Sequence, residues 1–178
     1  MLNAMEDLVG LCVRVSEQKL PRWDELPDLE LYMDQVLSLM ERYLGAYPGF
    51  GRKGLTASMV NNYVKLGLMP PPVKKKYTRT HLAQLLMICV LKASLSMEAI
   101  RGLLARSLAE ADVADFFDRF CDGFESSMKS ASDSARAELE SRPTDALPPI
   151  YGAALRAQAE QTLARKLYEA SFPQDTRE

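Results

Sequence analysis

Apolar residues recur at spacings of three and four along most of this chain, and alternating strand patterns are scarce. The segment ELPDLELYMDQVLSLMERYL (25–44) shows the spacing most clearly, and its apolar residues form one stripe. Such a stripe predicts an amphipathic helix of about four or five turns that begins near Pro27 and Asp28. Its members are Leu29, Tyr32, Met33, Val36, Met40, Tyr43 and Leu44. The dominance of this periodicity predicts an all-α, mainly helical fold.

A break and a short helix follow. The segment PGFGRKG (48–54) holds one proline and three glycines in seven residues, which favours a loop. Thr56 is suited to cap a short helix after the break, and Gly67 can take the left-handed turn that ends it. The prolines at 70–72 then predict an extended backbone, because each fixes its own φ and disfavours helix before it.

Two longer helices are predicted next. Thr78 is the expected cap of a helix whose apolar face comprises Leu82, Leu85, Leu86, Cys89 and Val90. Ser96 is the expected cap of the second helix, and Glu98 suits the positive end of its dipole. We expect Cys89, which lies in the apolar run, to act as a small core residue.

The last third of the chain is also predicted to be helical. One apolar face is shared by Val113, Phe116, Phe117, Phe120, Phe124 and Met128. Three prolines in RPTDALPPIYG (142–152) predict a loop, and a final helix is expected from about Ala153 to Phe172. That helix carries a row of Leu155, Ala159, Leu163 and Leu167, with small alanines that suit close helix packing.

Charge is distributed very unevenly, because no aspartate or glutamate occurs from Arg42 to Met97. These 56 residues hold nine of the chain's 22 lysines and arginines. The remainder therefore has 13 basic against 24 acidic residues, a net of −11, while the window stands at +9. Clustered cations neutralise phosphates and release condensed counterions, so the asymmetry indicates a polyanionic partner. The alternatives are a solvated face, or a patch that pairs with the acidic remainder of the same protein or of a second copy.

Composition and motifs exclude several classes. The N-terminus has no basic region of a signal peptide, and the longest apolar run (85–91) is far too short for a membrane span. The three cysteines are widely separated without C-x-x-C spacing, which argues against disulfides and zinc. We therefore expect a cytoplasmic protein with no cofactor, no metal and no membrane partner.

Catalysis is not predicted either. The single histidine, His81, is expected in the first turn of a helix, and no nucleophile–base pair or metal-ligand spacing is present. The acidic residues of the 108–140 region are spread around a helix surface. They include Glu110, Asp112, Asp115, Asp118 and Asp122. No residue is therefore assigned as catalytic, and we do not expect an enzyme.

The stretch 55–104 is typical of a winged helix-turn-helix, in which a short polar helix enters the major groove and a basic arm contacts the DNA backbone. Asparagine can pair with adenine through two hydrogen bonds, whereas hydroxyls and lysines position the protein on phosphates. The predicted DNA-binding residues are Thr56, Ser58, Asn61, Asn62, Tyr63, Lys65, Lys74, Lys75, Lys76, Tyr77 and Arg79.

This stretch resembles the DNA-binding domain of MerR-like transcription regulators over about 50 residues. The resemblance is carried by Leu66-Gly67-Leu68 with Pro70, by Lys75-Lys76-Tyr77-Thr78, and by the segment from Leu95 to Leu104. It implies DNA binding and dimerisation through a C-terminal helix. The family's helix usually has Arg-Tyr-Tyr-Glu where this chain has Asn61-Asn62-Tyr63-Val64, and its wing is longer and carries an arginine in place of Lys75.

A further resemblance, over roughly residues 19–125, is to an uncharacterised bacterial family, domain of unknown function number 1836. It is carried by four segments: Leu20–Asp28, Leu31–Gln35, Met59–Lys65 and Lys75–Tyr77. This resemblance implies a MerR-like helical fold and brings no established activity. We expect Trp23 and the LYMDQ segment to serve packing, and the alternative is a ligand pocket at these residues.

Two functions from different classes remain open. The first is a DNA-binding transcription regulator that uses a helix-turn-helix (Thr56–Leu66) and a basic wing (Lys74–Lys76), with double-stranded DNA as partner. The alternative is a non-enzymatic protein-interaction module whose degenerate helix-turn-helix binds an acidic partner. The C-terminal helices permit a homodimer, and the alternative for them is a helical bundle within a single chain. We expect three regions: N-terminal helices packing on the core (1–47), the winged helix-turn-helix (48–108) and a C-terminal helical region (109–178).

Overall fold

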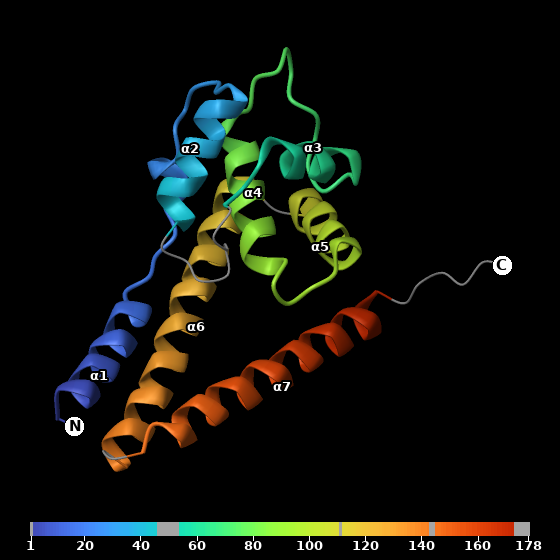
Figure 1. The fold of residues 1–178 in the computed structure, drawn as a ribbon. Coiled ribbons are helices and arrows are strands. Elements are labelled where there is room, and N and C mark those ends of the chain that lie inside the picture. Colours follow the sequence, from blue (N-terminus) through green and yellow to red (C-terminus); the bar gives the residue numbers. More distant parts are fainter. Residues whose placement is uncertain (1, 46–53, 111, 143–144, 173–178) are drawn as a thin grey trace. The chain divides into compact units, whose positions relative to one another are not determined.

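The fold was analysed in a computed structural model, which describes residues 2–45, 54–110, 112–142 and 145–172 (Figure 1). Within these residues the secondary structure comprises seven α-helices, one 3-10 turn and two isolated β-bridges. The expected all-α fold class is therefore confirmed. None of the helices in these ranges is long and apolar enough to cross a membrane.

The chain forms two compact units. We call Leu20–Asp122 the central unit, and Met1–Lys19 together with Gly123–Glu178 the terminal unit. Helix α6 (Val113–Ser141) contributes its first part to the central unit and the rest to the terminal unit. The expected regional boundaries near residues 47 and 108 stay a prediction.

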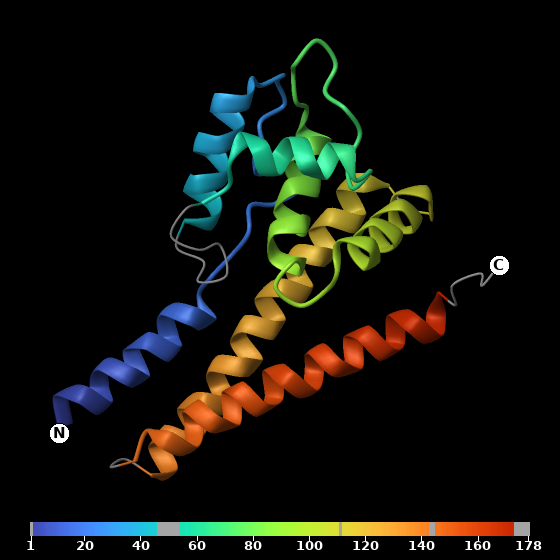
Figure 2. The ribbon, with the colours of Figure 1, turned by 45° about the vertical axis from the view of Figure 1, so that its right-hand side comes forward.

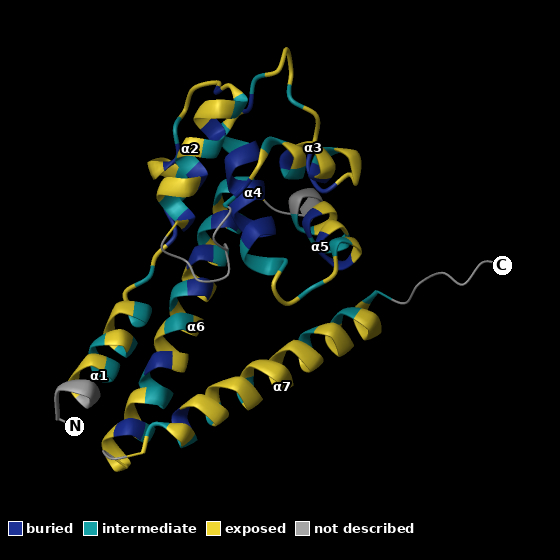
Figure 3. Ribbon diagram, viewed as in Figure 1, coloured by how far each residue is buried: buried dark blue, intermediate teal, exposed yellow. Residues whose placement is uncertain are grey.

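The core of the central unit is built around α4. Its helices are α2 (Met33–Leu44), α3 (Ala57–Lys65), α4 (Arg79–Leu91) and α5 (Met97–Glu110), preceded by the 3-10 turn η1 (Trp23–Glu25). Helix α4 packs against both α2 and α5, and α2 also contacts α3. All nine residues from His81 to Cys89 are buried (Figure 3). A helix buried on every side needs apolar residues all round, and the run LLMICVL supplies them.

The predicted helix ends are confirmed where capping chemistry sets them. The Thr56 hydroxyl accepts a hydrogen bond from the Met59 amide at 3.3 Å, and the Ser96 hydroxyl accepts one from the Ala99 amide at 3.1 Å. Each satisfies an amide that has no partner within its helix. Gly67 has a φ of +71°, the left-handed conformation expected at the end of α3.

The predicted start of the first stripe helix is wrong, because α2 begins at Met33 and not near Pro27. The Leu31 backbone forms a bridge with Tyr77, with N–O distances of 2.9 and 2.8 Å. This pairing requires an extended backbone before the helix. Leu29 and Tyr32 are consequently exposed, and only Val36, Met40 and Leu44 of the predicted stripe are fully buried.

The terminal unit contains α1 (Leu2–Ser16), the later part of α6, and α7 (Leu147–Ser171). Helix α7 begins at Leu147, earlier than expected, because its prolines do not break the helix. They lie in the first turn, where a backbone N–H has no acceptor within the helix and can be absent without the loss of a hydrogen bond. The Arg156 guanidinium donates to the Glu138 carboxylate at 2.8 Å and so links α7 to α6. Leu155, Leu163 and Leu167 are more than half exposed.

Candidate nucleic-acid interface

Helix α3 divides sharply into a buried and an exposed side. Val60 and Tyr63 are buried against the core. The exposed side chains are all polar or basic, and each was predicted from the sequence as a DNA contact: Ser58, Asn61, Asn62 and Lys65, with the cap Thr56 at the start. The helix therefore presents amide, hydroxyl and ammonium groups with no carboxylate among them.

Tyr63 does not share that exposed face. Its side chain is only 4% exposed, and burial raises the pKa of its hydroxyl to about 12. The ring serves the core, which argues against direct contact between Tyr63 and DNA. The aromatic residue that the MerR resemblance carries over thus has a packing role in this structure.

The basic arm after α3 is a tight turn, Val73–Lys76, which we call the lysine turn. Figures 1 and 2 show the segment between α3 and α4 leaving the helices as a loop. The Lys76 amide donates to the Val73 carbonyl at 2.9 Å, and the two residues form an isolated bridge. The two central residues have positive φ, 49° at Lys74 and 64° at Lys75. These are the signs of a type I′ turn, which favours asparagine and glycine.

Both lysines at the tip are exposed and unpaired within the described part of the chain. An L-residue in the left-handed region costs roughly 1–2 kcal/mol, because its Cβ crowds the following carbonyl. Two lysines thus adopt a backbone conformation that disfavours residues with a Cβ atom. Their two ammonium groups lie in solvent.

The base of the turn is held by Tyr77 and His81. Tyr77 is 3% exposed, so its ring, like that of Tyr63, lies in the core. It meets the His81 imidazole edge-on, with ring centroids 5.5 Å apart. The Thr78 amide donates to Nδ1 of His81 at 3.0 Å, which completes a capping box at the start of α4. Burial lowers the pKa of His81, and the backbone carbonyls of Pro70 and Pro71 oppose that effect.

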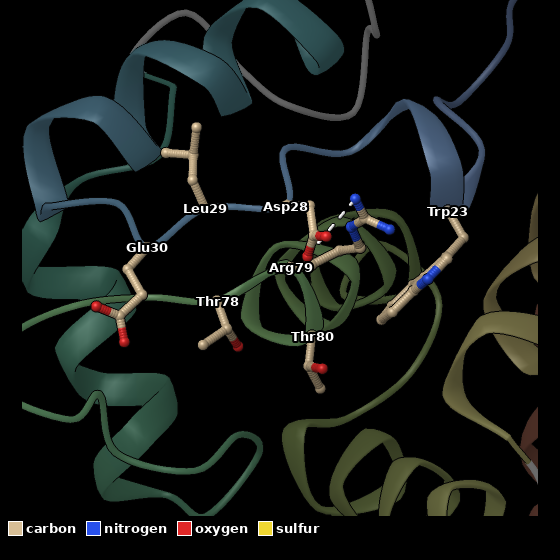
Figure 4. A pocket seen from close by; sticks show the side chains of 7 residues that line it. All are labelled: Trp23, Asp28, Leu29, Glu30, Thr78, Arg79 and Thr80. Atoms are coloured by element: carbon tan, nitrogen blue, oxygen red, sulfur yellow. Dashed lines mark ion pairs between the residues drawn. The ribbon is translucent and has the colours of Figure 1, made fainter.

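Segment 22–31 lies beside Lys76, the last residue of the lysine turn, and Arg79, which follows the turn. It carries four acidic residues, and we call it the acidic strap: Asp24, Glu25, Asp28 and Glu30. Lys76 donates to the Glu30 carboxylate at 2.9 Å, and this hydrogen bond raises the pKa of Lys76. Arg79 lies 3.9 Å from Asp24. It lies 3.7 Å from Asp28, and Figure 4 shows this ion pair. Two of the predicted DNA-binding cations therefore face carboxylates of their own chain.

The strap is anchored to the start of α6. The Trp23 amide donates to the Asp118 carboxylate at 2.8 Å, and the Trp23 ring meets Phe117 edge-on at 6.5 Å. Arg22 forms an ion pair with Asp122 at 2.7 Å. Asp118 and Asp122, which were expected on a helix surface, thus fix the end of the strap.

An open cleft of about 350 Å³ lies between the strap and the start of α4. Its lining combines one aromatic ring, one guanidinium, two carboxylates and two hydroxyls, contributed by Trp23, Arg79, Asp28, Glu30, Thr78 and Thr80, with Leu29. Sequence reasoning named a pocket at Trp23 only as the alternative to packing, and it did not bring Trp23 together with the other lining residues. The signal for it was the dense acidic run at 24–30, which lies N-terminal to the acid-free window.

Comparison with family models gives one match, to the family described as Domain of unknown function (DUF1836), over residues 21–120. The match covers more than half of the chain, and the chain therefore belongs to this family. The matched range nearly coincides with the central unit, Leu20–Asp122. No curated protein and no solved structure matches the chain.

Proposed function

We propose that the central unit binds double-stranded DNA as a transcription regulator with a MerR-like winged helix-turn-helix. Helix α3 would enter the major groove, and the lysine turn would serve as a short wing on the phosphate backbone. The observation that carries the proposal is the lysine turn, where two exposed lysines occupy left-handed positions. Backbone strain that persists at a surface tip is a recognised mark of a functional position.

The unpaired positive charges of this region support the binding of a polyanion. Lys65 at the end of α3 and the two tip lysines have no ion pair with any described residue. They come from the window that has no acidic residue at all. Unpaired surface cations of this kind supply the salt-dependent part of nucleic-acid affinity.

The exposed face of α3 supplies groups that can read bases. Asn61 and Asn62 are adjacent and exposed, and an asparagine amide matches the N6 and N7 groups of adenine. Ser58 and Lys65 lie one turn away along the helix, where they suit phosphate contacts. Two base-reading amides flanked by phosphate-binding groups favour DNA as the partner over an acidic protein, because binding to an acidic protein would not require two adjacent amides.

The proposal includes a homodimer through the C-terminal helices. Leu155, Leu163 and Leu167 of α7 are 57–69% exposed, and leucines so exposed are commonly covered by a partner. A two-fold dimer would present two copies of α3 to two half-sites.

Fluorescence anisotropy with a labelled random-sequence duplex tests the proposal. We expect binding at low salt that weakens steeply as salt is raised. Changing Lys74→Ala and Lys75→Ala should weaken binding to every sequence and reduce the salt slope by about 1.8, since each phosphate contact contributes about 0.9. The matched control, Lys129→Ala with Lys166→Ala, removes equal charge from the terminal unit and should have little effect.

Absence of binding at low salt would overturn the DNA proposal. The alternative would then be favoured, in which the same basic surface binds an acidic protein. Binding that survives the double lysine change with an unaltered salt slope would show instead that the lysine turn is not the wing.

A further inference from the structure

We infer that the acidic strap competes with DNA phosphate for Arg79 and Lys76, so that Asp24, Asp28 and Glu30 determine how weakly the protein holds nonspecific DNA. The inference rests on the proposed function and adds specificity-determining residues to it. The guanidinium of Arg79 is held in place without a hydrogen bond to any described residue.

Arg79 is oriented by an aromatic ring. Its guanidinium carbon lies 5.6 Å from the centroid of the Trp23 ring, and its side chain is 19% exposed. Nε is buried without a hydrogen-bond partner among the described residues. The terminal nitrogens approach Asp24 and Asp28 only at 3.9 and 3.7 Å, which is too far for a hydrogen bond. The planar fork is therefore positioned while its donors remain available.

The carboxylates of Asp24 and Asp28 can move away from Arg79 at little cost in free energy. Their side chains are 97% exposed at Asp24 and 87% exposed at Asp28, and exposed pairs at this separation are weak. A phosphate in the cleft could accept two parallel hydrogen bonds from the guanidinium, a geometry that neither carboxylate achieves here. The hydroxyls of Thr78 and Thr80 line the same cleft and could donate to the phosphate.

Lys76 is restrained in the same way but more firmly. Its ammonium donates to Glu30 at 2.9 Å, with side chains that are 36% and 52% exposed. A phosphate that approaches Lys76 therefore meets the negative charge of Glu30 beside the ammonium. Lys65, Lys74 and Lys75 have no acidic partner among the described residues, so the proposed interface contains three unpaired cations and two, Lys76 and Arg79, that face carboxylates.

This arrangement separates nonspecific from specific binding. On random DNA the free lysines act alone, while the strap repels phosphates near Arg79 and Lys76. At a site where the asparagines of α3 also pair with bases, the added contacts can displace the carboxylates. Like-charge repulsion that penalises the wrong partner more than the right one raises specificity.

The test compares Asp24→Asn/Asp28→Asn with the wild type in anisotropy against a random duplex. The matched control is Asp133→Asn/Glu140→Gln, which removes the same charge from α6 in the terminal unit. We expect about a fivefold gain in affinity for the strap variant, with a steeper salt slope, and a much smaller gain for the control. Adding Arg79→Gln to the strap variant should abolish the gain.

Glu30→Gln provides an independent measurement, because it frees Lys76 without touching Arg79, and it should also raise affinity for the random duplex. The only tryptophan of the chain, Trp23, reports on the cleft, so its fluorescence should change when DNA draws Arg79 away. Wild-type binding with a strap variant no tighter than the control would overturn this inference alone. Absence of binding by wild type and variants alike would overturn the proposed function as well.

Discussion

Replacing Lys75 by glycine should make the protein more stable while weakening its hold on DNA. Lys75 has a φ of +64°, and a side chain in that region costs roughly 1–2 kcal/mol. Glycine removes that cost but loses about 0.5–1 kcal/mol through its larger unfolded-state entropy. The balance is a gain in unfolding free energy on the order of 0.5–1 kcal/mol. Urea unfolding followed by circular dichroism is sensitive enough to detect it.

The control for this change is Lys75→Ala, which removes the same charge but keeps the Cβ in the left-handed region. The alanine variant should lose DNA affinity as the glycine variant does, without the gain in stability. Equal stability of the two variants, or a less stable glycine variant, would refute the argument that the lysine turn is strained. An unchanged DNA affinity in both would separate the strain from any role in binding.

Three further outcomes are expected. Asn61→Ala or Asn62→Ala should lose discrimination at one base pair by about 1–3 kcal/mol, with little change on random DNA, as measured by anisotropy with single-base variants of a selected site. Because the folded-state pKa of His81 lies below 6.5, the unfolded chain binds a proton first, so the unfolding free energy should fall as pH drops below about 6.5. His81→Gln, which can still accept from Thr78, should flatten that fall, and a persisting slope would assign it to other groups. A thiol reagent applied to the native protein should modify Cys12 alone, because Cys89 and Cys121 are buried. Burial also raises the pKa of Cys89 to about 11. Rapid reaction of all three thiols would contradict the structure.

The helices of the central unit were predictable because their signals are local. Thr56, Gly67 and Ser96 act through hydrogen bonds or dihedrals of residues within three positions, so the sequence around each contains the whole cause. Burial of Cys89 followed from the apolar run that surrounds it. The all-α class required only the spacing of apolar residues.

The remaining features depend on residues far apart in the chain. Helix α2 begins late because Leu31 pairs with Tyr77, and the hydrophobic spacing near Pro27 contains no trace of that pairing. Tyr63 and Tyr77 were predicted at the interface from their polar ends, whereas their rings fill the core. The acidic strap went unnoticed because charge was counted along the sequence, and its carboxylates meet Lys76 and Arg79 only after folding.

The bridge between Leu31 and Tyr77 has a consequence for the order in which the central unit folds. It closes a loop of 46 residues (77 minus 31), and loop closure of that length opposes pairing by about 3 kcal/mol. Its two hydrogen bonds return only about 1 kcal/mol each, so the bridge cannot form before α2 and α4 have packed. We expect refolding experiments to find the lysine turn docking last, and hydrogen exchange to find it among the first parts of this unit to open.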